Sequence, residues 1–217
     1  MRRLFDFLIA ATGIMLLSPV LLLLALLVSV DSKGGFLFRQ WRVGKGGKDF
    51  LLLKFRTMYR HPAGNRQITV SNKDPLITSM GVFLRRYKLD ELPQLFNVLK
   101  GDMSMVGPRP EVRKYVDLYT VHQRQILKIK PGITDIASLI FDNESRMLEK
   151  VADPETFYIK RIMPLKIRFN KVYMLNISLR KYFSIIGWSL LRVSHITVAR
   201  LRKSEMLCRE WLYNRSI

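Results

Sequence analysis

Two neighbouring carboxylates, Asp90 and Glu91, are the residues in this sequence best suited to chemistry. A Mg²⁺ ion prefers oxygen ligands, and adjacent carboxylates can supply them. At the N-terminus of a helix, free backbone N–H groups would also favour a phosphate group. One carboxylate could then attack phosphorus while the other holds the metal ion. The pair therefore indicates phosphoryl transfer.

Arginines that could bind phosphate stand on both sides of this pair. Arg85 and Arg86 lie about one turn upstream, and Arg109 lies downstream between two prolines that would fix its direction. A guanidinium group binds phosphate oxygens through paired N–H donors. The surroundings of the carboxylates therefore agree with a phosphorylated substrate.

A short helix is predicted to position the carboxylates. Its apolar residues recur at the spacing i, i+3, i+4 and i+7, and they are Leu92, Leu95, Phe96 and Leu99. Pro93 fits only the first turn, and Gly101 is a plausible stop. Asp90 would then lie at the N-terminus, where a capping role is an equally good explanation for that residue alone. Asp102 follows the stop and could simply close a turn, although we keep it as a further candidate.

A hairpin is predicted upstream, from Phe36 to Tyr59. Glycines 44, 46 and 47 separate two apolar or β-prone runs, a pattern typical of a β-hairpin. Lys54 and Arg56 in the second run could bind phosphate. On a strand edge they are equally suited to pair with acidic side chains or lipid head groups.

The chain begins with an apolar segment. From Phe7 to Val30 there are 24 residues without a charge, enough for one helix to cross a hydrocarbon core of ~30 Å. A cleaved signal peptide usually has an apolar run of only ~7–15 residues, and no convincing cleavage site precedes Asp31. We therefore expect the segment to remain as a membrane element.

Two features favour a membrane helix that enters and returns on one side. The pair Ser18-Pro19 lies at the middle of the segment, where proline removes a backbone donor and disfavours helix at the preceding residue. Each half would span roughly 18 Å, too little to cross alone. Basic residues flank both ends, and such charges normally stay cytoplasmic. We expect a re-entrant helix–break–helix; a single kinked span is the alternative.

The composition requires an anionic partner. The 217 residues include 37 Lys and Arg against 17 Asp and Glu, a formal charge of +20. An apolar fraction of 48% excludes a disordered basic tail, and one cysteine excludes a disulfide scaffold. Nucleic acid, anionic lipid and phosphorylated substrates remain as partner classes. The apolar N-terminus argues against nucleic acid.

The C-terminal part of the chain is basic and amphipathic. From Leu165 to Ile217 there are eleven Lys or Arg against two Glu, with aromatic and aliphatic residues interleaved. Beside a membrane anchor, this pattern predicts helices that lie in the plane of the lipid head groups. A solvated basic tail is the alternative.

At these residues the sequence resembles the bacterial sugar transferases, the monotopic phosphoglycosyl transferases. The longest shared stretch is LDELPQLFNVLKGDMSMVGPRPE, residues 89–111. The other shared segments are Ser18-Pro19, Arg39-Gln40-x-Arg42-x-Gly44, Lys54-Phe55-Arg56-Thr57-Met58 and Lys130-Pro131-Gly132-Ile133-Thr134. The resemblance implies a mainly α fold with a small β element (α+β).

The resemblance also implies an activity. Members transfer a sugar 1-phosphate from a UDP-sugar to polyprenyl phosphate such as undecaprenyl phosphate, releasing UMP, which initiates glycoconjugate or polysaccharide synthesis. Mapped onto this chain, Asp90 is the nucleophile that forms a covalent phosphosugar intermediate and Glu91 the main Mg²⁺ contact. Arg85 and Arg109 match arginines that contact phosphate. Arg86 and Arg42 are further candidates.

The resemblance implies three parts and a location. Residues 1–30 form the re-entrant helix, residues 31–164 the catalytic domain and residues 165–217 the membrane-surface helices. The protein would lie on the cytoplasmic face of the bacterial inner membrane, monotopic, in contact with anionic lipids. Its partners could include downstream glycosyltransferases.

One segment departs from the family pattern. After Thr134 many members continue with a Gly-Trp-Ala type sequence, whereas this chain has Asp135-Ile136-Ala137-Ser138 and a longer insertion through Pro154. This leaves the identity of the sugar open. Two rival functions also remain: a membrane-associated glycosyltransferase that releases UDP, and a non-catalytic basic membrane scaffold.

Overall fold

The computed structural model describes residues 2–59, 74–141, 144–175 and 177–193. The helices are α1 (Arg2–Asp31), α2 (Ser79–Arg86), α3 (Gln94–Lys100), α4 (Arg113–Val116), α5 (Ile136–Ile140), α6 (Glu144–Leu148), α7 (Pro154–Phe157), α8 (Met163–Leu175) and α9 (Leu179–Val193). The strands are β1 (Leu37–Val43), β2 (Asp49–Phe55), β3 (Ser104–Val106) and β4 (Gly132–Thr134). Short helical turns are η1 (Lys45–Gly47), η2 (Leu89–Glu91), η3 (Gln123–Lys128) and η4 (Tyr158–Ile162). The expected mainly helical fold with small β elements is confirmed.

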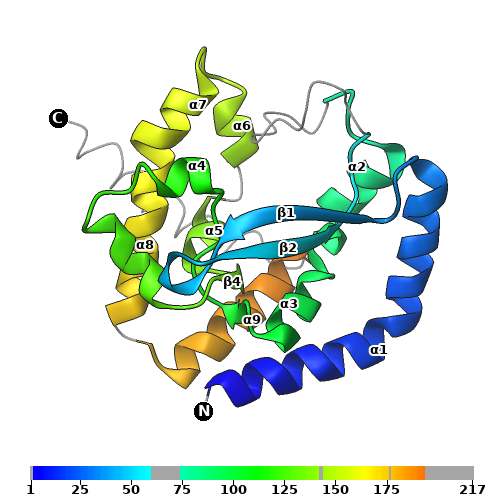
Figure 1. The fold of residues 1–217 in the computed structure, drawn as a ribbon, viewed down its shortest axis with the longest axis horizontal. Helices are drawn as coiled ribbons and strands as arrows, with labels where there is room; N and C mark the ends of the chain where they lie inside the picture. Colours follow the sequence, from blue (N-terminus) through cyan, green and yellow to red (C-terminus); the bar gives the residue numbers. More distant parts are fainter. Residues whose placement is uncertain (1, 60–73, 142–143, 176, 194–217) are drawn as a thin grey trace.

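The predicted hairpin is present and lies across the middle of the molecule (Figure 1). Strands β1 and β2 pair antiparallel, with Leu37 opposite Phe55 and Val43 opposite Asp49. The turn between them holds Gly46 at φ 69° and Gly47 at φ 76°, a left-handed backbone that glycine adopts without strain. A second small sheet pairs β3 with β4 in parallel.

Helix α1 is continuous from Arg2 to Asp31 and bends in its middle (Figure 1). The predicted break of the helix at Ser18-Pro19 is therefore wrong, because the helix continues through both residues. Pro19 has no N–H to donate to the carbonyl four residues earlier, that of Met15. The Ser18 hydroxyl donates to this same carbonyl at 2.9 Å. Because the freed acceptor is satisfied, the helix continues through the proline.

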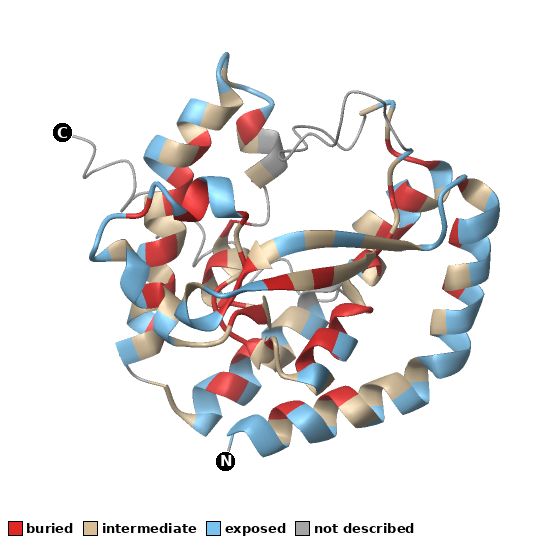
Figure 2. Cartoon of the chain, viewed as in Figure 1, coloured by how far each residue is buried: buried red, intermediate tan, exposed pale blue. Residues whose placement is uncertain are grey.

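Helix α1 packs on the rest of the protein along one side only. By length and composition it is the kind of helix that could cross a membrane. It contacts α2, α3 and β3, where Ala10, Leu24 and Val28 are buried. Its other side is largely exposed (Figure 2), with Leu22 at 72%. An apolar face left bare in this way suits a lipid environment.

Polar contacts fix the start of α1. The Arg3 guanidinium donates to the carbonyls of Val98 and Leu99 at the end of α3. Buried Asp6 accepts hydrogen bonds at 2.8 Å from three groups, which are Ser104 Oγ, the Met105 backbone N–H and the Tyr182 hydroxyl. The N-terminal helix is therefore joined to α3, β3 and α9.

Helix α8 lies beside the turn end of the hairpin, whereas α9 lies near the start of α1 (Figure 1). Helix α8 packs on α5, η3 and η4 around a core that contains Val116, Ile162 and Ile167. Helix α9 buries Tyr182 and Ile185 against β3 and leaves Phe183 exposed. The membrane-surface helices were expected over residues 165–217; the part after Val193 lies outside the described residues.

Candidate active site

The two carboxylates lie in the tight turn η2, between α2 and α3. The turn follows Lys88, whose φ of 56° is left-handed, a conformation that costs a non-glycine residue about 1 kcal/mol or more. Helix α3 starts only after Pro93, which occupies its N-cap position. Asp90 therefore does not cap α3, and the capping explanation for this residue fails. The predicted helix stop is confirmed, because Gly101 ends α3 at φ 98°.

The buried face of α3 differs from the predicted one. Leu95 is buried and Leu99 partly so, but Phe96 is 46% exposed. The inner positions are shared with Asn97, whose amide donates to the Leu51 carbonyl and accepts from the Leu53 N–H. The helix packs beside strand β2 and satisfies that strand's backbone, so a polar residue belongs on its inner face.

Glu91 is held between two cations. Lys54 Nζ donates to Glu91 Oε1 at 2.8 Å from strand β2. Arg109 donates to the same carboxylate with both terminal nitrogens, from Nη2 to Oε1 and from Nη1 to Oε2, the latter at 3.2 Å. Although burial opposes ionisation, the attraction of Arg109 and Lys54 holds the pKa of Glu91 well below its usual range. Glu91 is therefore a carboxylate anion near neutral pH.

Asp90 has the opposite electrostatic character. It is 8% exposed, and its burial raises the pKa of the carboxyl above the usual value, against the attraction of Lys54. A buried anion with weak compensation is poorly solvated, which favours its use as a nucleophile. Adjacent residues in one turn thus have pKa shifts of opposite sign, an arrangement typical of functional sites.

Two further predicted arginines lie near the carboxylates. Arg85 donates to Thr57 Oγ1 at 2.9 Å; burial lowers its pKa, and the charge of Asp90 opposes that shift. Arg42 from β1 donates to the Pro110 carbonyl at 3.1 Å and lies 3.9 Å from Glu111. Burial likewise lowers the pKa of Arg42. Both guanidinium groups therefore add positive charge around the site.

The remaining candidates lie elsewhere. Arg56 donates to the backbone carbonyls of Gly34, Gly35 and Leu37, which ties the end of α1 to the hairpin. The following two candidates are also occupied: exposed Arg86 stacks on the Tyr87 ring, and Asp102 accepts from Asn97 at the far end of α3. Arg86 and Asp102 therefore contact neither Asp90 nor Glu91, whereas Arg56 contacts the segment between α1 and β1.

The carboxylates suit a magnesium ion only together with substrate. Within the described residues, no group of three or more His, Cys, Asp or Glu side chains could hold a metal ion. Mg²⁺ commonly binds proteins through one or two carboxylates and completes its shell with water and substrate phosphates. Asp90 and Glu91 fit that requirement, since the pair is adjacent and ionisable.

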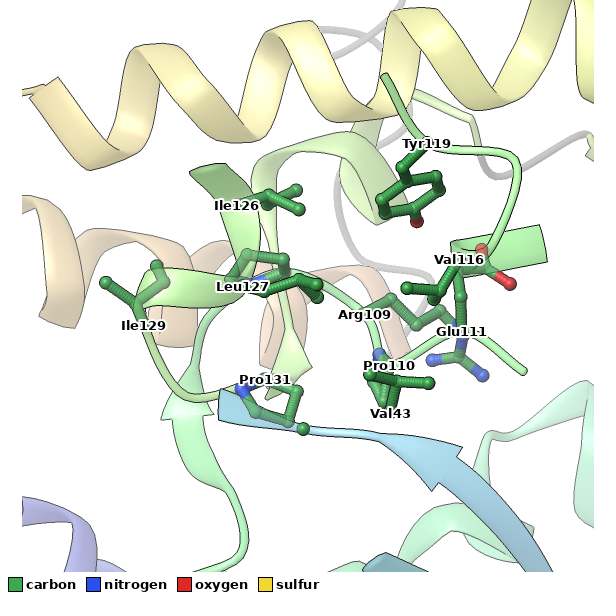
Figure 3. Close-up of a pocket in the computed structure, with 12 residues that line it drawn as sticks. Val43, Arg109, Pro110, Glu111, Val116, Tyr119, Ile126, Leu127, Ile129 and Pro131 are labelled. Atoms are coloured by element: carbon green, nitrogen blue, oxygen red, sulfur yellow. The ribbon is translucent and has the colours of Figure 1, made fainter. Parts of the chain in front are cut away.

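A small pocket lies beside Arg109 (Figure 3). Its lining combines Arg109 and Glu111 with the apolar residues Ile126, Leu127 and Pro131. Sequence reasoning did not anticipate the buried groups on this side of Arg109, Asp135 and Asn170. Asp135 carried a signal, as a carboxylate in a departing segment, whereas Asn170 carried none.

Comparison with known proteins finds relatives whose descriptions agree in naming a sugar-phosphate transferase. The chain is 40% identical over 144 residues to the UDP-N-acetylgalactosamine-undecaprenyl-phosphate N-acetylgalactosaminephosphotransferase of Aeromonas hydrophila, covering 64% of this chain and 34% of the relative. It is 37% identical over 178 residues to the UDP-glucose:undecaprenyl-phosphate glucose-1-phosphate transferase of Escherichia coli, covering 78% and 38%. The chain thus spans about a third of these two relatives' length.

A third relative is closer in length. The exopolysaccharide production protein ExoY of Sinorhizobium fredii is 35% identical over 174 residues, which cover 73% of this chain and 76% of that protein. Residues 1–194 match the family described as bacterial sugar transferase. This match includes α1, the β1–β2 hairpin, the turn η2 with both carboxylates, and the loop that holds Arg109. The chain belongs to the bacterial sugar transferase family.

Proposed function

We propose that this protein transfers a sugar 1-phosphate from a UDP-sugar to undecaprenyl phosphate and releases UMP. The observation that carries the proposal is the pairing of buried Asp90 with Glu91, which Lys54 and Arg109 hold as an anion. Family membership and the activities named for the relatives support the substrate classes.

The reaction follows in two displacements on one phosphorus atom. The Asp90 carboxylate attacks the β-phosphorus of the UDP-sugar; an aspartyl P–O bond forms, the bond to the bridging oxygen breaks, and UMP departs with that oxygen. A phosphate oxygen of undecaprenyl phosphate then attacks the same phosphorus. The aspartyl bond breaks, the carboxylate is regenerated, and the polyprenyl-diphosphate sugar forms.

The other residues bind and orient the anionic groups. Arg85 and Arg109 would contact phosphate oxygens, with Lys54 supplying further positive charge. Glu91 and Asp90 would hold Mg²⁺, which neutralises charge on the diphosphate when it is bound. The left-handed backbone at Lys88 fixes the turn that carries both carboxylates.

The site must also meet a lipid substrate. We propose that α1 lies in the cytoplasmic leaflet of the bacterial inner membrane as a bent, re-entrant helix, so the protein is monotopic. Its exposed apolar side and its bend support this arrangement. Exposed Phe183, Trp188 and Leu190 on α9 would lie among anionic head groups. Residues 31–164 would then form the catalytic part.

Product analysis tests the proposed reaction. Protein in nanodiscs would be mixed with Mg²⁺, undecaprenyl phosphate and a panel of UDP-sugars, and UMP would be separated from UDP. We expect UMP with one sugar, loss of at least 10³-fold in Asp90→Asn, and a phosphosugar adduct on the Asp90 peptide by mass spectrometry. The exposed carboxylate variant Asp49→Asn is the matched control. Release of UDP would instead establish a glycosyltransferase. Release of neither product would leave an unusual donor or a non-catalytic scaffold, which complementation by Asp90→Ala in cells would separate.

Thiol labelling tests the membrane arrangement. In a Cys208→Ser background, Leu4→Cys and Lys33→Cys place one thiol at each end of α1. A re-entrant helix predicts that an impermeant reagent reaches both thiols only from the cytoplasmic side. Labelling from opposite sides would establish a kinked single span.

A further inference from the structure

A buried carboxylate, Asp135, joins three parts of the protein behind Arg109. Asp135 is 1% exposed, and both of its oxygens accept hydrogen bonds. Oδ1 accepts from the Ser138 backbone N–H at 2.5 Å, which caps helix α5. Oδ2 accepts from the Arg109 backbone N–H at 3.1 Å and from Asn170 Nδ2 at 2.6 Å. One carboxylate therefore connects α5, α8 and the Arg109 loop.

The Arg109 backbone depends on this carboxylate because of its neighbours. Pro108 and Pro110 have no N–H, so Arg109 supplies the backbone donor of this three-residue segment. Upstream, Gly107 donates to the Thr134 carbonyl at 3.0 Å, in continuation of the β3–β4 pairing. The next backbone donor, the Arg109 N–H, bonds to the Asp135 carboxylate instead of a backbone carbonyl.

The close approach of the two segments leaves little freedom between them. A Cβ atom on Gly132 would lie 2.1 Å from the Gly107 nitrogen, so the backbones are in direct contact. Asp135 follows this contact by three residues and Arg109 follows it by two. The position of the Arg109 Cα atom is therefore set by the β3–β4 contact and by the Asp135 hydrogen bond together.

We propose that Asp135 is a positioning residue that aims Arg109 at the carboxylate turn. The sequence of contacts runs from Asp135 to the Arg109 backbone, and from the Arg109 side chain to both oxygens of Glu91. Glu91 adjoins the nucleophile Asp90. The inference rests on the proposed function and adds to it a residue that touches neither substrate nor metal.

Asn170 supports the same arrangement from helix α8. It is 3% exposed, and its amide donates to Asp135 Oδ2. Its own Oδ1 has no hydrogen-bond partner among the described residues, and it lies on a pocket that Arg109 and Asp135 also line. The Asp135 charge also favours the Arg109 cation and contributes to its raised pKa, after the larger effect of Glu91.

Hydrogen exchange tests the positioning directly. Because two prolines flank Arg109, a peptide over residues 107–110 reports chiefly on the Arg109 amide. We expect Asp135→Ala to accelerate its exchange at least tenfold, and Asn170→Ala to do so less. The matched control is Asp153→Ala, since Asp153 caps α7 through Thr156 as Asp135 caps α5. Unchanged exchange in Asp135→Ala would overturn the proposal.

A double-mutant cycle tests the catalytic consequence. We expect Asp135→Asn to lower kcat for UMP release by about ten- to a hundredfold, with a smaller change in KM. In an Arg109→Ala background the same substitution should change kcat less than threefold, because the residue acts through Arg109. Equal losses in both backgrounds would overturn the inference.

The two hypotheses fail in different ways. If the unmodified protein releases no UMP, the proposed function is wrong, and hydrogen exchange still decides whether Asp135 fixes Arg109. If Asp135→Ala does not fold, Asp135→Asn and Asn170→Ala give the same comparison. Asp153→Ala should retain full activity.

Discussion

Lys54→Met removes one of the two cations that hold Glu91 while keeping a side chain of similar length. Lys54 Nζ lies 2.8 Å from Glu91 Oε1, and the two side chains are only 19% and 13% exposed. Arg109 remains on the other side of the carboxylate. The substitution therefore tests how much the second cation contributes to the fold and to the reactivity of Asp90.

The expected loss of stability follows from this geometry. At 2.8 Å the Coulomb attraction is about 6 kcal/mol for an effective dielectric constant of 20. Desolvation offsets most of it, since burial lowers the pKa of Lys54 in spite of Glu91. A hydrogen bond to a charged group contributes about 1.5–3 kcal/mol net. For a protein of this size that loss lowers Tm by about 3–12 °C.

The pH dependence has a defined sign. The pKa of Glu91 is lowered in the folded protein, so its ion pairs stabilise the fold above the unfolded pKa of about 4.3. That stabilisation is lost as pH falls through the lowered folded pKa. The difference in Tm should therefore be full at pH 7 and disappear only in strong acid.

Enzyme activity should depend on pH through Asp90, whose pKa is shifted in the opposite direction to that of Glu91. Asp90 reacts as a carboxylate, its pKa is raised by burial, and Lys54 is the main charge that opposes this rise. Activity should fall as pH decreases through that raised pKa. Loss of Lys54 raises the pKa further, so the acid limb of the pH–rate profile should move to higher pH.

The assay combines thermal unfolding in nanodiscs with UMP release across pH. Lys100→Met is the matched control, because Lys100 pairs with Asp102 at 3.7 Å but is 74% exposed, and exposed pairs contribute about 0–1 kcal/mol. A Lys54→Met protein with the Tm and pH profile of the unmodified protein would refute the reasoning.

Three further substitutions test the supports of the site. Gly132→Ala places a Cβ atom 2.1 Å from a backbone nitrogen and should prevent folding or lower Tm severely. The control Gly187→Ala lies in open space on α9 and should stabilise the protein by about 0.5–1 kcal/mol. Equal Tm values for the two variants would contradict the close contact at Gly132. Asp6→Asn disturbs a buried acceptor of three hydrogen bonds and should lower the free energy of unfolding by about 1–3 kcal/mol. Limited proteolysis should then cleave α1 at earlier times. Unchanged proteolysis would contradict the role of Asp6 in holding the start of α1. Ser18→Ala leaves the Met15 carbonyl without its hydroxyl donor and should lower the stability of the protein in a bilayer by about 0.6 kcal/mol, measured as a small decrease in Tm. The control Ser29→Ala, away from the proline, should give a smaller decrease.

Local patterns predicted several elements correctly. The glycines at 46 and 47 indicated the hairpin turn, and Gly101 indicated the end of α3, because left-handed backbone favours glycine wherever the segment lies. The proline at 19 indicated a distortion of α1. Its outcome depended on a neighbouring hydroxyl, and the local rule overestimated the distortion by predicting a break.

Other predictions depended on packing partners that the sequence does not specify. Apolar spacing placed Phe96 on the inner face of α3, but the neighbouring strand needed the Asn97 amide there. Arg56 matched the pattern of a phosphate-binding residue; its guanidinium donates to nearby backbone carbonyls, and a role in phosphate binding stays a prediction. Periodicity and residue type describe a segment alone and do not specify what lies opposite it.

The sequence by itself determined the apolar character of the N-terminal helix, the hairpin, and the adjacent carboxylates with their basic surroundings. These depend on hydropathy, backbone freedom and charge, which are properties of single residues and near neighbours. Only the tertiary structure decided that Lys54 and Arg109 meet on Glu91, and that Asp135 supports Arg109 from behind. Those contacts join residues 18 to 37 positions apart, and chain packing, with the close contact at Gly107 and Gly132, brings them together.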